Sequence, residues 1–464
     1  MKQGPKKHER APTSVAGANQ KAAKRRRDDD KNHWDLDRMP RMLKNGRYKI
    51  ERIIGKGTFG TVYTAWDEKY HEQVALKIIR SVEKYRVSGL REVDVLKMMY
   101  KEMKKLRDKP PKPILKLFSY FEVDPGHLVM VCELLGNSLY DVIRANDHFG
   151  FPFSACVYIG AQIVRAVQFL HKKCGYMHTD LKLENIVFTY RCEDAEMMEP
   201  KSNYYDKQYK KQIKHKFRLP CRWEIKLIDL GGATLITGKK RGRTINTRQY
   251  RCPEVILHRG WEAPSDMWSI GCILSEIYTG ELLFGTHDNI EHLALMEKVT
   301  GEAFCGSFLG QHENGYEFDD EDHDYSDTER GCAVLQPFTL TDDAWATTLQ
   351  RQGCEDGESY FYRPDMSILS ASSRDYVSAR PPLAHILSEV RNGERGPEAA
   401  LFASYRGIIE SCLRLDPKRR ATACDASRLC EMLTKEAFEQ ESMQPPGSTY
   451  SQMVFYHESE GFYH

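Results

Sequence analysis

The middle of the chain carries HTDLKLEN at residues 178–185, and this stretch decides the fold. Asp180 can accept the proton of a hydroxyl group and aim its oxygen, and Lys182 can neutralise negative charge on a group in transfer. Asn185 offers a neutral amide oxygen, a ligand type that hard cations such as Mg²⁺ accept. The segment therefore predicts a loop that combines a base, a cation and a metal ligand.

A second carboxylate follows at Asp229, within IDLG at residues 228–231. It ends an apolar run that we expect to form a strand. A carboxylate at such a place can bridge a metal ion to phosphate oxygens. Asn185 and Asp229 are thus the predicted Mg²⁺ ligands.

Upstream of both, GKGTFGTV occupies residues 55–62. Its glycines let backbone amides approach phosphate oxygens that a Cβ atom would hold away. The pattern alone is weak, because many turns are rich in glycine. However, expected strands flank it on both sides, whereas a dinucleotide-binding loop leads from a strand into a helix, and no Gly-Lys-Ser/Thr of a Walker-type loop follows. We therefore expect a phosphate-covering loop between two strands.

A buried cation is expected at Lys77, which ends the apolar run VALK at residues 74–77. A lysine there is costly to bury unless anions meet it. ATP phosphates and Glu92, in the helical stretch that follows, would supply those anions. The alternative is a strand-end lysine whose ammonium group simply reaches solvent.

Hydrophobic periodicity places these motifs on a small β region followed by a larger helical one. We expect strands at 48–54, 61–66, 74–79 and 128–135, and helices at 84–107, 155–171 and 265–278.

In order and separation, the motifs resemble the protein-kinase signature set over roughly residues 48–433. The resemblance implies an α+β, bilobal protein-kinase fold, with a small antiparallel N-lobe at about 48–135 and a larger helical C-lobe at about 136–433. It implies ATP and Mg²⁺, and catalysis by Asp180, Lys182 and Lys77. The nucleotide contacts that it implies are Ile54, Gly55, Gly57, Phe59, Gly60, Val62, Ala75, Lys77, Glu92, Glu133 and Leu135.

EHLALMEK at residues 291–298 closely resembles EHLAMMER, the motif of the LAMMER or CDC-like kinases in the CMGC group. ELLG at 133–136 and TRQYR at 247–251 agree, and Lys182 resembles serine/threonine kinases. The resemblance implies Ser/Thr substrates, tyrosine autophosphorylation and a nuclear role in splicing or, as in trypanosomatid relatives, at the kinetochore. The same resemblance implies that the protein is located in the nucleus, with the cytoplasm as an additional location. The motif itself is expected to pack rather than to react.

The chain departs from the family pattern at several positions. Leu230 replaces the usual Phe and should still pack, and Cys252 replaces an Ala. Cys132 stands where a bulky residue is usual, which predicts a buried thiol and a roomier pocket behind adenine. KKRGR at 239–243 makes the activation segment basic, so we expect acidic or phosphorylated substrates rather than Arg/Ser-rich ones.

Two further resemblances are structural. Asp266 resembles the helix aspartate that anchors the catalytic loop, and Arg420 resembles the arginine that pairs with Glu254. Both are expected to act through buried charge pairs rather than through chemistry.

Composition is that of a globular enzyme, with 41% hydrophobic and 29% charged residues and a net charge of +2. We expect no membrane span and no secretory signal. The 13 cysteines are scattered, which favours a reducing cytosolic or nuclear compartment. Four segments are expected to flank or interrupt the kinase domain. They are a disordered basic tail at 1–44, insertions at 191–223 and 305–358, and a C-terminal tail at 434–464.

Two other readings stay open. A pseudokinase scaffold would keep the fold without turnover, although the expected catalytic groups are all present. Accessory nucleic-acid binding is suggested by KAAKRRR at 21–27 and by the basic residues between 207 and 218, although no nucleic-acid module surrounds them. The basic run at 21–27 is also compatible with nuclear import or with a solvated charge run. The sequence leaves the oligomeric state open.

Overall fold

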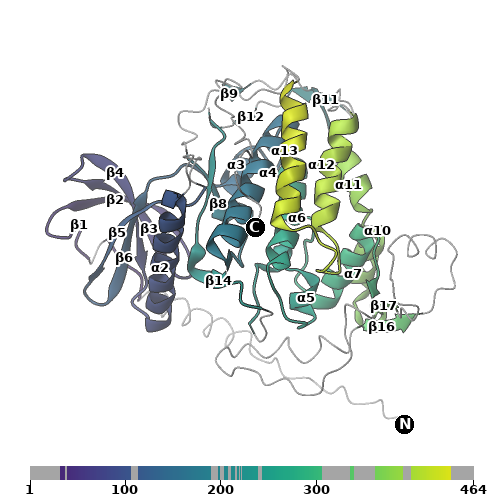
Figure 1. Cartoon of the computed structure of the whole chain (residues 1–464), viewed down its shortest axis with the longest axis horizontal. Helices are drawn as coiled ribbons and strands as arrows, with labels where there is room; N and C mark the ends of the chain where they lie inside the picture. The colour runs from purple at the N-terminus through teal and green to yellow at the C-terminus, as the bar shows by residue number, and fades with distance from the viewer. Residues whose placement is uncertain are drawn as a thin grey trace, which may run out of the picture. The chain divides into compact units, whose positions relative to one another are not determined.

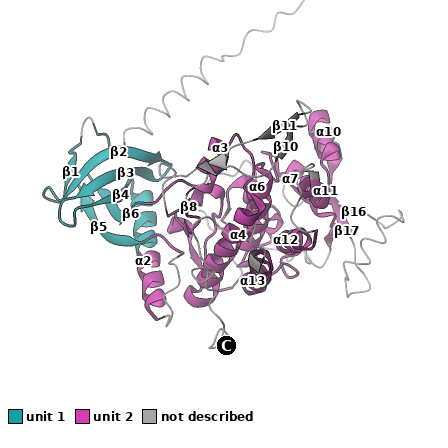
Figure 2. Cartoon of the chain, turned by 90° about the horizontal axis from the view of Figure 1, so that it is seen from above, with its two compact units in different colours: residues 1–93, 116–134 teal, residues 94–115, 135–464 magenta. Residues whose placement is uncertain are grey.

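The structure is a computed structural model. It describes residues 32–36, 39–105, 113–189, 197–198, 203–206, 211–214, 217–218, 220, 222–238, 243–305, 335–338, 361–389 and 399–439. The chain divides into two compact units, coloured separately in Figure 2. Unit 1 comprises Met1–Val93 and Lys116–Leu134, and unit 2 comprises Asp94–Leu115 and Leu135–His464.

Unit 1 is built on a six-stranded antiparallel sheet in the order β1-β2-β3-β4-β6-β5 (Figure 1). Its strands are β1 (Met42–Leu43), β2 (Tyr48–Lys56), β3 (Gly60–Asp67), β4 (Glu72–Ile79), β5 (Leu117–Val123) and β6 (His127–Glu133). The four strands expected from the sequence are confirmed. Strands β1 and β5 were not expected. Helix α2 (Glu83–Lys105) follows β4, as its apolar periodicity predicts.

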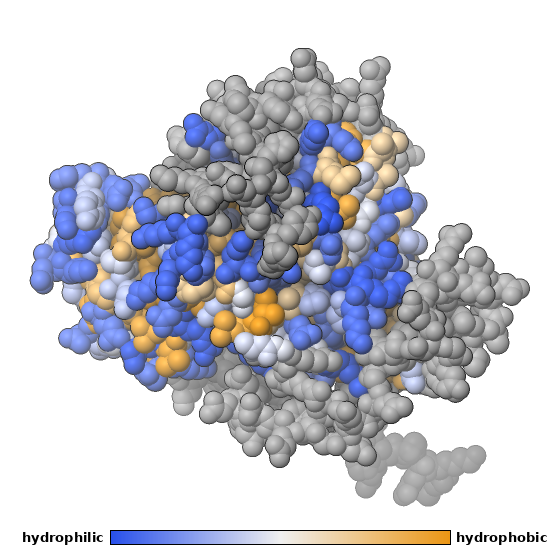
Figure 3. All heavy atoms as spheres, viewed as in Figure 1, coloured by the Kyte–Doolittle hydropathy of each residue, from blue (hydrophilic) through white to orange (hydrophobic). Residues whose placement is uncertain are grey.

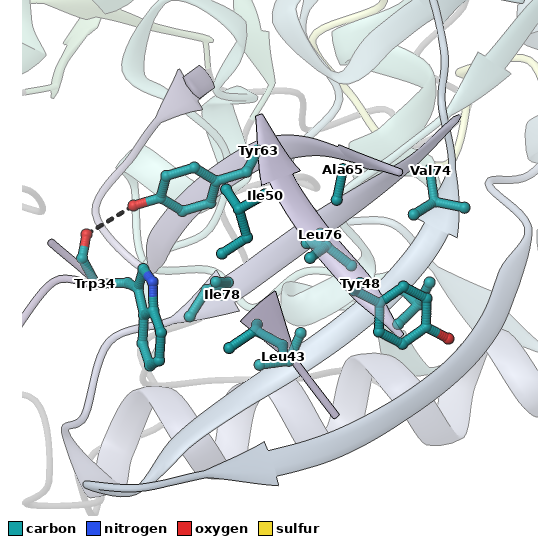
Figure 4. Close-up of a cluster of buried hydrophobic side chains, with 11 residues drawn as sticks. Trp34, Leu43, Tyr48, Ile50, Tyr63, Ala65, Val74, Leu76 and Ile78 are labelled. Atoms are coloured by element: carbon teal, nitrogen blue, oxygen red, sulfur yellow. Dashed lines mark hydrogen bonds between the residues drawn. The ribbon is translucent and has the colours of Figure 1, made fainter. Parts of the chain in front are cut away.

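The core of unit 1 includes a residue from the expected N-terminal tail. Trp34 is only 3% exposed and belongs to one cluster with Tyr48, Tyr63 and Leu76 (Figure 4). The Tyr63 hydroxyl donates to the Trp34 carbonyl at 2.6 Å. The prediction that the tail is disordered as far as about residue 44 is therefore wrong at Trp34 and at Leu43, which are both buried in this cluster, because a large aromatic ring buries enough apolar surface to fix the chain beside it.

Unit 2 is mainly helical, as expected. Helix α4 (Phe153–Gln168) packs against α6 (Pro264–Thr279) and α13 (Ala423–Glu439), and α12 (Ala399–Cys412) packs against α6 and α13. The other α-helices of unit 2 in the described part of the chain are α3 (Leu139–Ala145), α5 (Pro253–Ile256), α7 (Asn289–Thr300), α10 (Ala371–Ala379) and α11 (Leu383–Glu389). Helix α6 is buried along nearly its whole length, so it forms the centre of the unit.

Among the described residues, Phe153–Cys174 is the one helical stretch long and apolar enough to cross a membrane by length and composition. Its tested window is 67% buried inside the structure, which fits a core helix. On the face drawn in Figure 3, hydrophobic residues are interspersed among hydrophilic ones, as on most folded proteins.

The expected insertions are described only in part. Residues 191–223 include two short antiparallel pairs, β10 (Asn203–Asp206) with β11 (Lys211–Lys214) and β9 (Met197–Met198) with β12 (Phe217–Arg218). Near the second insertion, β15 (Phe304–Cys305), β17 (Phe361–Pro364) and β16 (Leu335–Phe338) form a three-stranded sheet. The basic run at 21–27, residues 239–242 and the tail beyond Glu439 lie outside the described residues.

Candidate functional site

The glycine-rich loop joins β2 to β3, so strands flank it on both sides as expected. The amide of Gly57 donates to the carbonyl of Gly60 at 2.9 Å and closes the turn. A Cβ atom on Gly60 would collide with the backbone oxygen of Ile78, whereas one on Gly57 would meet nothing within 4 Å. Gly60 is therefore needed for the fold of unit 1, and Gly57 lies at an open position where a phosphate group can approach the backbone.

Lys77 and Glu92 form the ion pair expected from the sequence. The lysine Nζ lies 2.7 Å from Glu92 Oε2 and 3.0 Å from Oε1. The two side chains are 18% and 3% exposed, so the pair is largely desolvated. Lys77 is thus not a strand-end lysine that reaches for solvent. Strand β4 and helix α2 hold its ammonium group in place.

Strands β4 and β6 carry two further expected nucleotide contacts, Ala75 and Glu133, and also Cys132. Ala75 of β4 is directly opposite Cys132 of β6, and both are buried. Burial raises the pKa of the Cys132 thiol well above its usual range, and the expectation that this cysteine is buried is confirmed. The carboxylate of Glu133 accepts from the Lys116 amide at 2.6 Å.

The remaining expected nucleotide contacts are partly or largely accessible. Ile54 is 45% and Phe59 is 43% exposed. Exposure is intermediate for Gly55, Val62 and Leu135. Leu135 belongs to unit 2, whereas the other four belong to unit 1.

In unit 2, the loop after β7 (Tyr176–Met177) brings the expected base and cation together. Lys182 Nζ donates to Asp180 Oδ2 at 2.8 Å and to Thr247 Oγ1 at 3.0 Å. The hydroxyl and the amide of Thr247 donate to Asp180 Oδ1 at 2.7 and 3.1 Å. Thr247 was not expected as a site residue, and the only signal for it was its place in the TRQYR motif.

The expected metal ligands lie on adjoining segments. Asn185 ends the 3-10 turn Leu183–Asn185, and its carbonyl accepts from the amide of Ile228 at 3.0 Å. Asp229, the next residue, has a left-handed backbone with φ 62°. Asn185 Nδ2 donates to the Asp180 carbonyl at 2.8 Å, so its amide oxygen is the atom left to face a cation.

The donor set fits a magnesium ion that also binds phosphate oxygens. Among the described residues, no group of three or more His, Cys, Asp and Glu side chains could hold a metal by itself. Mg²⁺ usually takes only one or two carboxylates and completes its shell with water and substrate phosphates. One amide and one carboxylate meet that need.

Asp266 anchors the HTDLKLEN loop at residues 178–185 through backbone amides, as expected. Its Oδ2 accepts from the His178 amide at 2.8 Å and lies 2.8 Å from His171 Nε2, and its Oδ1 accepts from the Thr179 amide at 2.9 Å. The carboxylate is fully buried. Burial raises the pKa of Asp266, but the bonds from His171 and the backbone outweigh burial and keep the pKa below its usual value.

The second expected structural pair is also present. Arg420 donates to both carboxylate oxygens of Glu254, at 2.7 and 3.0 Å, and neither side chain is more than 2% exposed. The guanidinium group also lies over the ring of Trp268, 5.2 Å from its centroid. This network joins α5, which begins at Pro253, to α6 and to the segment before α13.

Comparisons with known proteins agree with this geometry. The family model described as "Protein kinase domain" matches residues 48–431. The crystal structure of the kinase domain of PF14_0431 superposes with a TM-score of 0.64 at 28% identity, over 86% of this chain and 98% of that one. The predicted bilobal kinase fold class is thus confirmed.

Three relatives illustrate the group. Serine/threonine-protein kinase AFC2 of Arabidopsis thaliana is 40% identical over 55% of this chain and 56% of its own length. Serine/threonine-protein kinase Doa of Drosophila melanogaster is 39% identical over 55% and 28%. Dual specificity protein kinase CLK2 of Mus musculus is 38% identical over 55% and 48%. The match covers about half of these relatives or less, and it confirms the predicted resemblance to the LAMMER group.

Proposed function

Because the chain belongs to the protein kinase family, we propose that it transfers the γ-phosphate of ATP to serine and threonine hydroxyls of proteins. The observation that carries this proposal is the cluster of Asp180, Lys182 and Thr247, in which one carboxylate meets an ammonium group and a hydroxyl within 3.0 Å. Such a cluster can orient an acceptor hydroxyl and balance the charge of a phosphoryl group.

Each side chain then has a separate task. Asp180 accepts the proton of the substrate hydroxyl and aims its oxygen, and Lys182 stabilises the negative charge that develops on the phosphoryl oxygens. Thr247 fixes Asp180 Oδ1 by two hydrogen bonds. In unit 1, Lys77 is oriented by Glu92 to bind the α- and β-phosphates. Catalysis is therefore mostly positioning and charge stabilisation.

A magnesium ion would be held by Asn185 and Asp229. When bound, it neutralises charge on the β- and γ-phosphates. The chain's own contribution is to keep the two oxygen ligands on adjoining segments, with the Asn185 amide nitrogen tied to the Asp180 carbonyl.

An assay of phosphate transfer to a general protein substrate tests the proposal. Asp180→Asn should lower kcat by about a hundredfold to ten-thousandfold while leaving ATP binding in place. Equal turnover of the variant and the wild type would refute the assignment of Asp180 as base. Absence of turnover in the wild type, with ATP bound, would instead favour the pseudokinase scaffold.

The likeness to dual-specificity kinases supports two finer parts of the proposal, namely tyrosine autophosphorylation and the use of Ser/Thr acceptors. The basic run at 239–243 supports acidic or phosphorylated substrates. A degenerate peptide array tests this preference, and enrichment of arginine around the acceptor would overturn it. Mass spectrometry of the bacterially expressed protein tests autophosphorylation, and the absence of phosphotyrosine would count against it.

For the biological role, the resemblance of residues 291–298 to the LAMMER motif supports regulation of a nuclear process, either splicing or chromosome segregation. A fluorescently tagged copy should therefore be nuclear, and its co-purified proteins should separate the two processes. The run at 21–27 supports accessory nucleic-acid binding. A salt-dependent shift of a labelled RNA is the expected result, and binding that ignores salt would contradict it.

A further inference from the structure

The tip of the glycine-rich loop is tied to the chain that follows strand β4. The amide of Arg80 donates to the carbonyl of Phe59 at 3.0 Å, and the Arg80 guanidinium donates to the carbonyl of Thr58 at 3.2 Å. Arg80 is only 6% exposed although it is charged. Two consecutive carbonyls of the tip therefore accept from one arginine, which orients the peptide groups between Thr58 and Gly60.

An aromatic contact holds the same tip from the side of helix α2. The ring of Phe59 meets the ring of Tyr85 edge to face, with centroids 5.5 Å apart and planes at 84°. This is a favourable arrangement for two aromatic rings. Arg80 and Lys84 lie over the Tyr85 ring at 5.1 and 5.0 Å from its centroid, and each adds a cation–π attraction. Phe59 is 43% exposed, so hydrophobic burial alone does not explain its position.

Tyr85 also shares a face of α2 with the residue that orients Lys77. Tyr85 and Glu92 are seven residues apart, which is close to two helical turns, so their side chains leave the helix in nearly the same direction. Glu92 meets Lys77 through its carboxylate, and Tyr85 meets the glycine-rich loop through its ring. One helix face therefore contacts both phosphate-binding elements of unit 1.

From these contacts we infer that Tyr85 and Arg80 are positioning residues for the triphosphate. They clamp the Thr58–Phe59 tip so that the loop amides stand where phosphate oxygens bind. Neither residue touches the reacting atoms, and the inference rests on the proposed function, because it concerns how ATP is held. The clamp acts on the phosphate end of the nucleotide and leaves the adenosine end unchanged.

The test is a comparison of nucleotide affinities in the full chain. Tyr85→Ala should raise the Kd for ATP about threefold to tenfold, the range expected from one aromatic pair, with the Kd for adenosine unchanged. Tyr85→Phe should bind ATP like the wild type, because the ring and not the hydroxyl makes the contacts. Equal loss of affinity for ATP and adenosine, or no loss for ATP, would overturn the inference.

The chain offers a matched control. Tyr70 also lies under two cations, Arg47 and Lys69, each 5.0 Å from its ring centroid. It is 60% exposed and follows β3, in the turn to β4. Tyr70→Ala should therefore keep the wild-type Kd for both ligands. A Tyr70→Ala variant as weak for ATP as Tyr85→Ala would show that the loss is not specific to the clamp.

The single variant Phe59→Ala keeps the inference testable if Tyr85→Ala folds poorly, and it should raise the Kd for ATP, but not for adenosine, about threefold to tenfold. Phe59→Ala removes the other half of the ring contact from an exposed loop position. If the clamp exists, Phe59→Ala and the double variant with Tyr85→Ala should lose ATP affinity to a similar extent, because the second change removes a contact already lost. Independent, multiplying losses would overturn the inference. Failure of the wild type to bind ATP would refute the proposed function instead.

Discussion

The most informative single substitution is Asp266→Asn, because it keeps the shape of a fully buried side chain and changes only its hydrogen-bonding capacity. The carboxylate accepts the amides of His178 and Thr179 and also contacts His171 Nε2. An asparagine offers one oxygen acceptor and replaces the other oxygen by a donor. Whichever way the amide turns, a donor must face a donor.

The loss of stability in Asp266→Asn can be estimated from the hydrogen bonds that the carboxylate accepts. With the amide oxygen at the Oδ2 position, the contacts to His178 and His171 survive in weakened form, and the NH₂ group faces the amide of Thr179, 2.9 Å from Oδ1 in the wild type. One buried N–H group is then left without an acceptor, which destabilises the fold by about 1–3 kcal/mol. The hydrogen bonds that remain are weaker, because their acceptor is no longer charged. We expect the free energy of unfolding to fall by about 2–4 kcal/mol.

Activity should fall as well, because Asp180 directly follows Thr179. If the Thr179 amide moves away from its lost acceptor, the base shifts with it, and a shift of about 1 Å can lower kcat roughly a hundredfold. The KM for ATP should change less, since the glycine-rich loop and Lys77 take their positions from strands β2 to β4.

The measurements are urea unfolding and steady-state phosphate transfer at saturating ATP. Asp365→Asn is the matched control, because Asp365 also accepts three hydrogen bonds, from the Ser367 amide, the Ser367 hydroxyl and Gln336 Nε2, but is only partly buried. The control should unfold and turn over like the wild type. If Asp266→Asn did the same, the anchoring role of Asp266 would be refuted.

Three further substitutions test other parts of the molecule. Arg420→Met should lower the free energy of unfolding, measured with urea, by about 3–5 kcal/mol, because it leaves Glu254 buried and unpaired. The double variant Glu254→Gln with Arg420→Met should recover part of that loss. A double variant that is as unstable as Arg420→Met, or less stable, would contradict the buried pair. Thr247→Ala should lower kcat about tenfold to a hundredfold, because the Thr247 hydroxyl hydrogen-bonds both to Asp180 and to Lys182, which are charged. Thr247→Ser keeps the hydroxyl and should turn over nearly like the wild type. Unchanged turnover in the alanine variant would exclude a role for this bridge. Burial raises the pKa of Glu276 from 4.5 to about 7, so the folded state favours the protonated carboxyl. The stability that this protonated carboxyl contributes is present below the unfolded pKa and is lost as the pH rises through about 7. Denaturation between pH 5 and 8 should therefore show a flatter pH dependence for Glu276→Gln than for the wild type, and identical slopes would rule out this titration.

The Asp266 and Arg420 contacts, whose partners lie far apart along the chain, were expected only from the family resemblance. The other site residues that could be predicted have partners at fixed, short separations. Asp180, Lys182 and Asn185 lie within one eight-residue motif, and Lys77 meets Glu92 because a strand leads directly into a helix. Thr247 could not be predicted in this way. It lies 65 residues beyond Lys182 along the chain, and a threonine has no local pattern that marks it as the partner of a distant carboxylate.

Trp34 shows a different limit. Composition over residues 1–44 is polar and charged, which predicts disorder. When composition is averaged over a stretch of sequence, a single aromatic residue has little effect on the result. The free energy gained by burying apolar surface, however, depends strongly on that one ring. Trp34 is 3% exposed and packs against the His127 ring at 5.3 Å. Only the folded sheet supplies the site for it, so the end of the polar segment follows from tertiary structure and not from composition.

The same dependence on tertiary structure applies to the catalytic loop itself. Thr179, which precedes the proposed base, and Asp229, a proposed metal ligand, have left-handed φ angles of 69° and 62°. This conformation is unfavourable for residues other than glycine, and most of all for β-branched threonine. The amide of Thr179 is held by Asp266, and its hydroxyl donates to the Gly232 carbonyl at 2.9 Å. The HTDLKLEN segment alone would relax out of this geometry, so the active site forms only when helix α6 and the segment around Gly232 are folded around it.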